Sequence, residues 1–199
     1  DNVDVFTPRA KDQARNELGI PLDSKVVAFG AGNIDEQRKG FHLLQESLEI
    51  IVSKNISGIH LLMFGQGSEA IEGLPFPSTS VGRIDDDKRL SWIYSAADCF
   101  VAPSLEENLA NTCLEAMSCG VPLVAFGIGG MPDMIEHKKT GYLSEIADSS
   151  SLAEGICWVL HANNKTNQLS LDARSKAERK FSLQDQAFQF LKLFKTTLD

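Results

Sequence analysis

Short apolar runs alternate with segments of helical periodicity along most of this chain. Residues 25–30 and 59–64 are almost wholly apolar, which is typical of strands buried on both faces of a sheet. Between these runs, residues 40–54 place apolar side chains at helical spacing. Strict alternation of this kind predicts an α/β fold: a doubly wound, Rossmann-like parallel sheet with helices on both faces.

The remaining elements follow from the same patterns. Gly120 is predicted to end a helix as its C′ residue, and Ser151 with Glu154 is predicted to open another as a capping box. We expect further strands at residues 79–82, 98–102, 121–126 and 142–143, and helices at residues 90–97, 107–120, 151–161, 165–179 and 184–197. Ligands of such sheets bind at the carboxyl ends of the strands, where the Gly-rich turns of this chain also fall.

Composition narrows the classes of function. The formal net charge is −8 and the pI is about 5.0, which disfavours nucleic acid and anionic membrane surfaces because both require a basic face. No apolar run is long enough for a membrane span, and no signal peptide is evident. The four cysteines show no CxxC spacing, so we interpret them as reduced and structural. These features predict a cytoplasmic protein.

The segment PSLEENLANTCLEAMSCG at residues 103–120 carries the strongest functional signal. It follows a predicted strand, and its helix start would aim the amides of Leu109, Ala110, Asn111 and Thr112 at the ligand edge of the sheet. Such a helix start favours a diphosphate.

Two carboxylates flank that helix start, Glu107 and Glu115. They would lie about 12 Å apart along a continuous helix, which is comparable to the distance from ribose to hexose in a nucleotide sugar. The simpler interpretation is that Glu107 is a helix-start acid favoured by the macrodipole and Glu115 a solvated helix glutamate. Spacing alone favours the simpler interpretation.

A second candidate site is the basic turn Arg38-Lys39-Gly40, which follows the first strand. Its cations would neutralise phosphate, and glycine would let the backbone approach a ligand. Taken alone, an exposed basic turn is the simpler interpretation. The turn Gly65-Gln66-Gly67 is weaker, since it lacks the third glycine and the later acidic residue of a dinucleotide fingerprint. The histidines show no ligand spacing, so no metal site is predicted.

The two ends of the chain suggest a piece of a longer protein. The first residues, DNVDVFTP, carry no initiator methionine and resemble the end of a linker. We therefore expect residues 1–22 to be a linker and domain entry and residues 23–180 to be a nucleotide-sugar-binding domain. Residues 181–199 are predicted to be an aromatic C-terminal helix, which packs either on a missing N-terminal domain or within an ordinary core.

The motifs together resemble the C-terminal, donor-binding domain of a retaining GT-B glycosyltransferase of family 4. The resemblance covers nearly the whole chain. It is most specific in the E-x7-E motif from Glu107 to Glu115, and the stretches FGQG and GIGGMPDMIEHKKTGYL also match. The segment ENLANT (residues 107–112) most resembles the sequences of bacterial exopolysaccharide and capsule transferases.

The resemblance implies a role for each matching residue. Glu107 would meet the donor sugar as the catalytic residue, and Glu115 would accept hydrogen bonds from the ribose. The amides of residues 109–112 and the Lys39 ammonium would hold the diphosphate, and the backbone at Arg83 and Ile84 would meet the base.

The sequence departs from the family at two places. Asn108-Leu109-Ala110 stands where Gly-Phe-Gly is usual, and Asn33-Ile34 stands where an arginine is usual. Arg38 is the residue that could supply that positive charge.

The implied chemistry is transfer of a sugar from a nucleoside diphosphate to an acceptor hydroxyl with retained anomeric configuration. Cations and amides would neutralise the leaving diphosphate without a metal or cofactor. The acceptor site would lie on a preceding domain, through which the protein could also reach the inner face of a membrane. A sugar-nucleotide epimerase and a non-catalytic nucleotide-binding module are the alternatives. Base, sugar, acceptor, linkage and oligomeric state are not predicted by the sequence.

Overall fold

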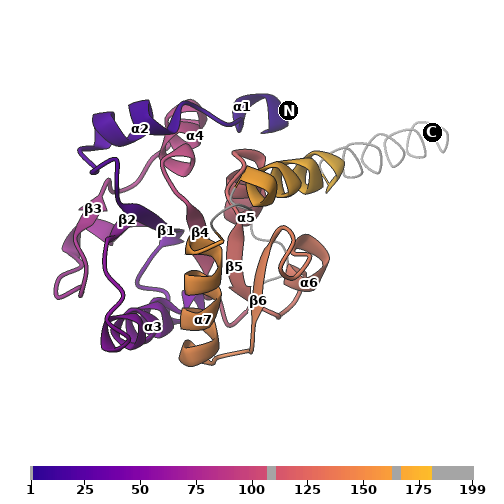
Figure 1. Cartoon of the computed structure of the whole chain (residues 1–199). Helices are drawn as coiled ribbons and strands as arrows, with labels where there is room; N and C mark the ends of the chain where they lie inside the picture. Colours follow the sequence, from indigo (N-terminus) through magenta and orange to yellow (C-terminus); the bar gives the residue numbers. More distant parts are fainter. Residues whose placement is uncertain (1, 107–110, 163–166, 181–199) are drawn as a thin grey trace, which may run out of the picture.

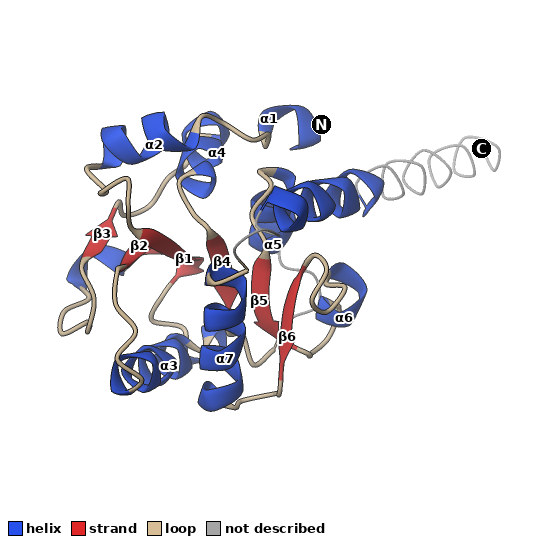
Figure 2. Ribbon diagram, in the orientation of Figure 1, coloured by secondary structure: helices blue, strands red, loops and turns tan. Residues whose placement is uncertain are grey.

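A six-stranded, wholly parallel sheet forms the centre of the molecule, in the order β3-β2-β1-β4-β5-β6 (Figure 1; Figure 2). The computed structural model describes residues 2–106, 111–162 and 167–180. The strands are β1 (Lys25–Asn33), β2 (Ile59–Gln66), β3 (Ser78–Ser80), β4 (Cys99–Ala102), β5 (Leu123–Phe126) and β6 (Gly141–Ser144). The predicted α/β, Rossmann-like fold class is confirmed.

Helices cover both faces of this sheet. The helices are α1 (Asn2–Val5), α2 (Lys11–Leu18), α3 (Phe41–Ser53), α4 (Asp87–Ser95), α5 (Asn111–Ser118), α6 (Met131–Met134) and α7 (Ser149–Leu160). Figure 1 shows α3 and α7 on one side of the sheet and α2, α4, α5 and the helical residues 167–180 on the other. No described helix combines the length and the apolar character that a membrane span requires.

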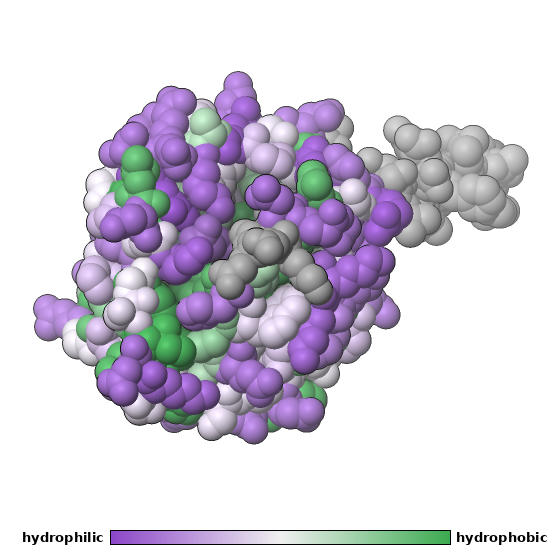
Figure 3. Space-filling model, viewed as in Figure 1, coloured by the Kyte–Doolittle hydropathy of each residue, from purple (hydrophilic) through white to green (hydrophobic). Residues whose placement is uncertain are grey.

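The buried side chains divide into two cores because successive residues of a strand point to opposite faces. Val26 and Ala28 of β1 join the cluster under α4 and α5, whereas Val27 and Phe29 join the cluster under α3 and α7. Figure 3 shows a mostly polar surface with an apolar area between α3 and β3. The loop between β2 and β3 contributes partly buried apolar residues to the core on the α3 side.

Several boundaries differ from the sequence-based expectation. Helix α7 begins at Ser149 rather than Ser151, since the Asp148 side chain accepts hydrogen bonds from the backbone N–H groups of Ser150 and Ser151. Asp148 is therefore the N-cap, and the predicted capping box was wrong. Gly120 does end α5 in the left-handed conformation, with φ of 74°. The predicted helix at 184–197 lies outside the described residues.

The order of the strands reverses between β1 and β4, so the connections leave these two strands in opposite directions. The turns that follow them touch: the Leu105 N–H donates to the Arg38 carbonyl at 2.8 Å. Gly40, with φ of 71°, lies so close to Pro103 that an added Cβ would stand 1.8 Å from the Pro103 carbonyl oxygen. The backbone itself therefore joins the two turns.

Residues 3–22 pack against the same core. Phe6 and Ile20 are buried in the cluster under α4, and Arg15 of α2 is 4% exposed. The division of the chain at residue 22 stays a prediction, but this segment makes specific contacts with the sheet.

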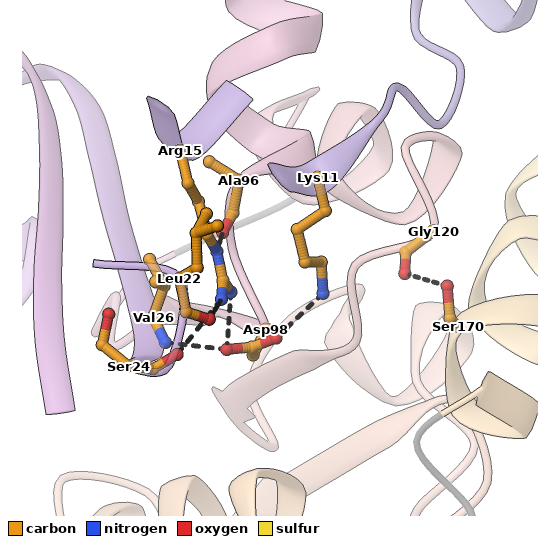
Figure 4. A network of polar contacts seen from close by, with 9 residues as sticks. All are labelled: Lys11, Arg15, Leu22, Ser24, Val26, Ala96, Asp98, Gly120 and Ser170. Atoms are coloured by element: carbon orange, nitrogen blue, oxygen red, sulfur yellow. Dashed lines mark hydrogen bonds and ion pairs between the residues drawn. The ribbon is translucent and has the colours of Figure 1, made fainter. Parts of the chain in front are cut away.

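The contacts of Arg15 centre on Asp98, which precedes β4 (Figure 4). The Asp98 carboxylate accepts from Lys11 Nζ, from an Arg15 guanidinium nitrogen and from the Val26 N–H, each at 2.8 Å. Burial alone would raise the pKa of Asp98, but the two cations and these hydrogen bonds outweigh burial and hold the pKa below its usual value. Arg15 also donates to the carbonyls of Ala96, Leu22 and Ser24.

Substitution Asp98→Asn is expected to destabilise the protein by about 3 kcal/mol or more, because it leaves a buried guanidinium without its counter-charge. The free energy of unfolding would be measured by urea titration. Asp85→Asn removes an ion pair with Arg83 whose side chains are 75% and 69% exposed, and it should change stability by less than about 0.5 kcal/mol.

The same variant should change the acid dependence of stability. Since the pKa of Asp98 is lowered by folding, its contribution is present above about pH 4 and is lost as the pH falls towards the folded-state pKa. Wild type should lose stability in that acid range more steeply than Asp98→Asn. Equal slopes would contradict the assignment.

Gly40→Ala and Gly19→Ala form a matched pair for the junction of the two turns. Both glycines have left-handed backbone, with φ of 71° and 67°, but an added Cβ at Gly19 meets nothing within 4 Å. Gly40→Ala should therefore cost about 1–3 kcal/mol more than Gly19→Ala in thermal or urea unfolding, the usual cost of overpacking. Equal losses would show that the clash with Pro103 relaxes freely.

Candidate functional site

A pocket of about 330 Å³ opens at the carboxyl ends of the strands. It receives residues from the ends of β1 and β2, from the segment after β3, and from α4 and α5. Its lining residues are Ala31, Gly32, Phe64, Gly65, Arg83, Ile84, Asp85, Leu90 and Thr112. This is the edge of the sheet at which the sequence predicted a ligand.

Three of the predicted site residues line this pocket together. Arg83 and Ile84 follow β3, whereas Thr112 lies in the first turn of α5. Arg83 is exposed and pairs with Asp85 at 2.8 Å. The fold thus brings together the segment predicted to meet the base and the helix start predicted to meet the phosphates, although the roles themselves stay predictions.

Glycine shapes the floor of the pocket. Gly65 is the penultimate residue of β2, with φ of 116°, and an added Cβ there would lie 1.8 Å from the Ala31 carbonyl oxygen. The carboxyl ends of β1 and β2 therefore approach closely here, and Gly65 is required for that packing. A dinucleotide fingerprint is not needed to explain it.

The basic turn lies at the neighbouring strand end. Arg38 and Lys39 belong to the 3-10 helix η1 (Gln37–Lys39), between β1 and α3. Arg38 is exposed and forms an ion pair with Glu36, and Lys39 is half-buried. Through the contacts at Leu105 and Gly40 described above, this turn is fixed against the turn that leads from β4 towards α5. The two motifs that the sequence singled out are therefore neighbours.

Glu115 is held by a tyrosine from another helix. The Tyr94 hydroxyl of α4 donates to Glu115 Oε2 at 2.9 Å, and Glu115 is half-buried. Burial raises the pKa of Glu115; the hydrogen bond from Tyr94 opposes this rise, and the carboxylate of Asp87 adds to it. These contacts contradict the interpretation of Glu115 as a solvated helix glutamate.

The other predicted residues fall partly outside the described chain. Glu107, Leu109 and Ala110 lie in the range 107–110, which is not described. Asn111 is the first residue of α5 and is exposed. Within the described ranges, histidine, cysteine and carboxylate side chains form no group of three that could hold a metal ion.

Sequence reasoning missed Tyr94 and Phe64. Both lie in runs whose spacing predicts core packing, and both do pack in the core. Only the polar end of Tyr94, whose buried hydroxyl needs a partner, was a signal that could have led to Glu115.

Comparison with known proteins agrees with this geometry. Residues 24–162 match the family model described as glycosyl transferases group 1. The D-inositol 3-phosphate glycosyltransferase of Mycolicibacterium smegmatis is 31% identical over 173 residues, which cover 80% of this chain and 38% of that protein. The enzyme of the same name from Corynebacterium urealyticum is 29% identical, over 98% of this chain and 49% of its own length. The chain thus spans less than half the length of these relatives.

Solved structures share the fold. Sucrose-phosphate synthase from Thermosynechococcus elongatus matches with a TM-score of 0.79 and 26% identity, over 100% of this chain and 51% of that chain. Anabaena HepE in complex with UDP-glucose matches with a TM-score of 0.79 and 21% identity, over 96% of this chain and 55% of that chain.

One solved structure is covered almost completely by this chain. The C-terminal domain of a glycosyl transferase group 1 family protein from Francisella tularensis matches with a TM-score of 0.75 and 20% identity, over 91% of this chain and 98% of that domain. The fold is therefore that of the C-terminal domain in GT-B glycosyltransferases. Since the family model covers most of its length, this chain belongs to the glycosyl transferases of group 1.

Proposed function

We propose that this chain is the donor-binding half of a glycosyltransferase that moves a sugar from a nucleoside diphosphate to an acceptor hydroxyl. The observation that carries the proposal is the junction of the two turns after β1 and β4. It fixes two cations, Arg38 and Lys39, beside the turn that follows β4, and a pocket of about 330 Å³ opens beside the end of β1. We propose that this cationic turn and the amides that open α5 together bind a diphosphate.

In this proposal, different residues at the strand ends bind different parts of the nucleotide sugar. Lys39 and the amides of residues 109–112 bind the diphosphate, and Arg38 adds positive charge nearby. Glu115 accepts hydrogen bonds from the ribose, and the backbone at Arg83 and Ile84 meets the base. Glu107 contacts the donor sugar and acts as the catalytic residue.

The reaction that we propose is hexosyl transfer with retained configuration, as in family 4 enzymes. The leaving diphosphate gains charge as the glycosidic bond breaks, and fixed amides and cations stabilise that charge without reorganising. This set of charges is sufficient for the role, so we propose that no metal takes part. The acceptor would bind to the domain that this chain lacks, in agreement with its coverage of less than half of the curated relatives.

The biological setting is also part of the proposal. Anabaena HepE has been solved with UDP-glucose, and we propose a UDP-sugar as the first donor to test. We further propose a cytoplasmic enzyme of bacterial polysaccharide synthesis that reaches the membrane face through its other domain. The prediction for residues 181–199 lies outside the described residues.

Calorimetric titration of residues 1–199 with UDP-, GDP- and ADP-sugars is the direct test. The chain should bind one nucleoside diphosphate and its sugar but transfer sugar poorly or not at all, because the acceptor half is absent. Robust sugar transfer by this chain alone would contradict the proposal that the acceptor binds to another domain. Interconversion of the free sugar nucleotide would indicate an epimerase.

Lys39→Ala should weaken nucleoside diphosphate binding by about 1.5–3 kcal/mol, the scale of a hydrogen bond to a charged group. Binding of the uncharged nucleoside should hardly change. Lys25→Ala is the matched control, since Lys25 is an exposed lysine at the amino end of β1, at the opposite edge of the sheet. An equal loss for nucleoside and diphosphate, or an equal loss in the control, would remove Lys39 from the phosphate site.

A further inference from the structure

The side chain of Tyr94 is fixed more firmly than a surface hydroxyl could be. The residue is 0% exposed, and its ring packs edge-on against Phe64, Phe100 and Phe6 with centroid distances of 5.3, 5.6 and 6.1 Å. Aromatic neighbours on three sides prevent the ring from swinging away. The position of the hydroxyl is therefore set by the core rather than by solvent.

The hydroxyl connects this core to the ligand edge. Phe64, which packs against Tyr94, also lines the pocket, and so does Thr112, one helical turn before Glu115 on α5. The Tyr94 hydroxyl reaches Glu115 at 2.9 Å. A rigid aromatic cluster thus fixes a carboxylate close to the residues that line the pocket.

The hydrogen bond from Tyr94 leaves other acceptor sites of the Glu115 carboxylate. An ionised carboxylate has about four lone-pair sites, and the Tyr94 hydroxyl occupies one of them. A half-buried carboxylate needs further partners to offset its desolvation. A pair of ligand hydroxyls, such as a ribose diol, would supply them.

We infer that Tyr94 is a positioning residue for nucleotide recognition, which orients the Glu115 carboxylate towards the ribose hydroxyls of the donor. The inference rests on the proposed function. The inference goes beyond the proposed function because it assigns ribose recognition to a pair of residues from two helices rather than to Glu115 alone.

The charged groups around the pair define its response to pH. Asp87 of α4 acts on Glu115, and the thiols of Cys113 and Cys119 lie near Tyr94. The ribose would bind the ionised carboxylate, so affinity should fall as the pH falls through the pKa of Glu115. Loss of the Tyr94 hydrogen bond removes an interaction that lowers this pKa, so the fall should begin at a higher pH.

Tyr94→Phe tests the inference because it keeps the ring and removes only the hydroxyl. The probe is UDP, GDP or ADP, whichever wild type binds most tightly, together with its 2′,3′-dideoxy analogue. We expect the Kd of the ribose nucleotide at pH 8 to rise roughly three- to tenfold, the scale of one lost hydrogen bond. We also expect the acid loss of binding to begin at higher pH, while the dideoxy analogue should bind wild type and variant equally.

Tyr142→Phe is the matched control. Tyr142 of β6 is also buried and its hydroxyl also pairs with a carboxylate, that of Glu154 on α7, on the other face of the sheet. This variant should lower the melting temperature without changing the Kd or its pH profile. Comparing melting temperatures of both variants separates a loss of stability from a loss of recognition.

Glu115→Gln gives a second route if Tyr94→Phe folds poorly. It should abolish the difference in acid dependence between the ribose nucleotide and its dideoxy analogue, and Tyr94→Phe added to it should have little further effect. An unchanged Kd and pH profile in Tyr94→Phe, or an equal loss for the dideoxy analogue, overturns the inference alone. A wild-type chain that binds none of the three nucleoside diphosphates overturns the proposed function as well.

Discussion

The Asp98 carboxylate is the contact on which the arrangement of the two central strands depends. It immediately precedes β4, accepts a hydrogen bond from the first apolar residue of β1, and pairs with Lys11 and Arg15 from α2. One side chain thus connects the amino ends of both strands at the point where the strand order reverses. The Arg15 guanidinium is buried, so removing the Asp98 carboxylate would leave a buried positive charge without its counter-charge.

This arrangement leaves the opposite edge of the sheet available for a ligand. At the amino ends, charge is neutralised within the protein, and the carbonyls of three residues take up the other donors of Arg15. At the carboxyl ends, the cationic turn and the turn that follows β4 are brought together by backbone contacts at Gly40 and Leu105. The backbone of this turn is therefore positioned by the fold.

The sequence predicted the features that depend on local patterns. Alternating apolar runs predicted the parallel sheet, and turns rich in glycine and proline predicted the edge of the sheet at which the pocket opens. The capping of α7 was misread because Asp148 and Ser151 are both good N-caps, and only the geometry of the chain decides between them. The pairing of Tyr94 with Glu115 depends on how α4 and α5 pack, which no spacing along the chain records.

The carboxylates of Asp98 and Glu115 differ in how far folding compensates their charge. Asp98 has three partners within the protein and a lowered pKa, as expected of a carboxylate whose charge is satisfied by folding. Glu115 has the Tyr94 hydroxyl as its partner and a raised pKa, so folding leaves its charge only partly compensated. Burying a carboxylate whose charge is incompletely compensated costs stability. This contrast distinguishes Glu115 from Asp98, whose charge is compensated by three partners within the protein.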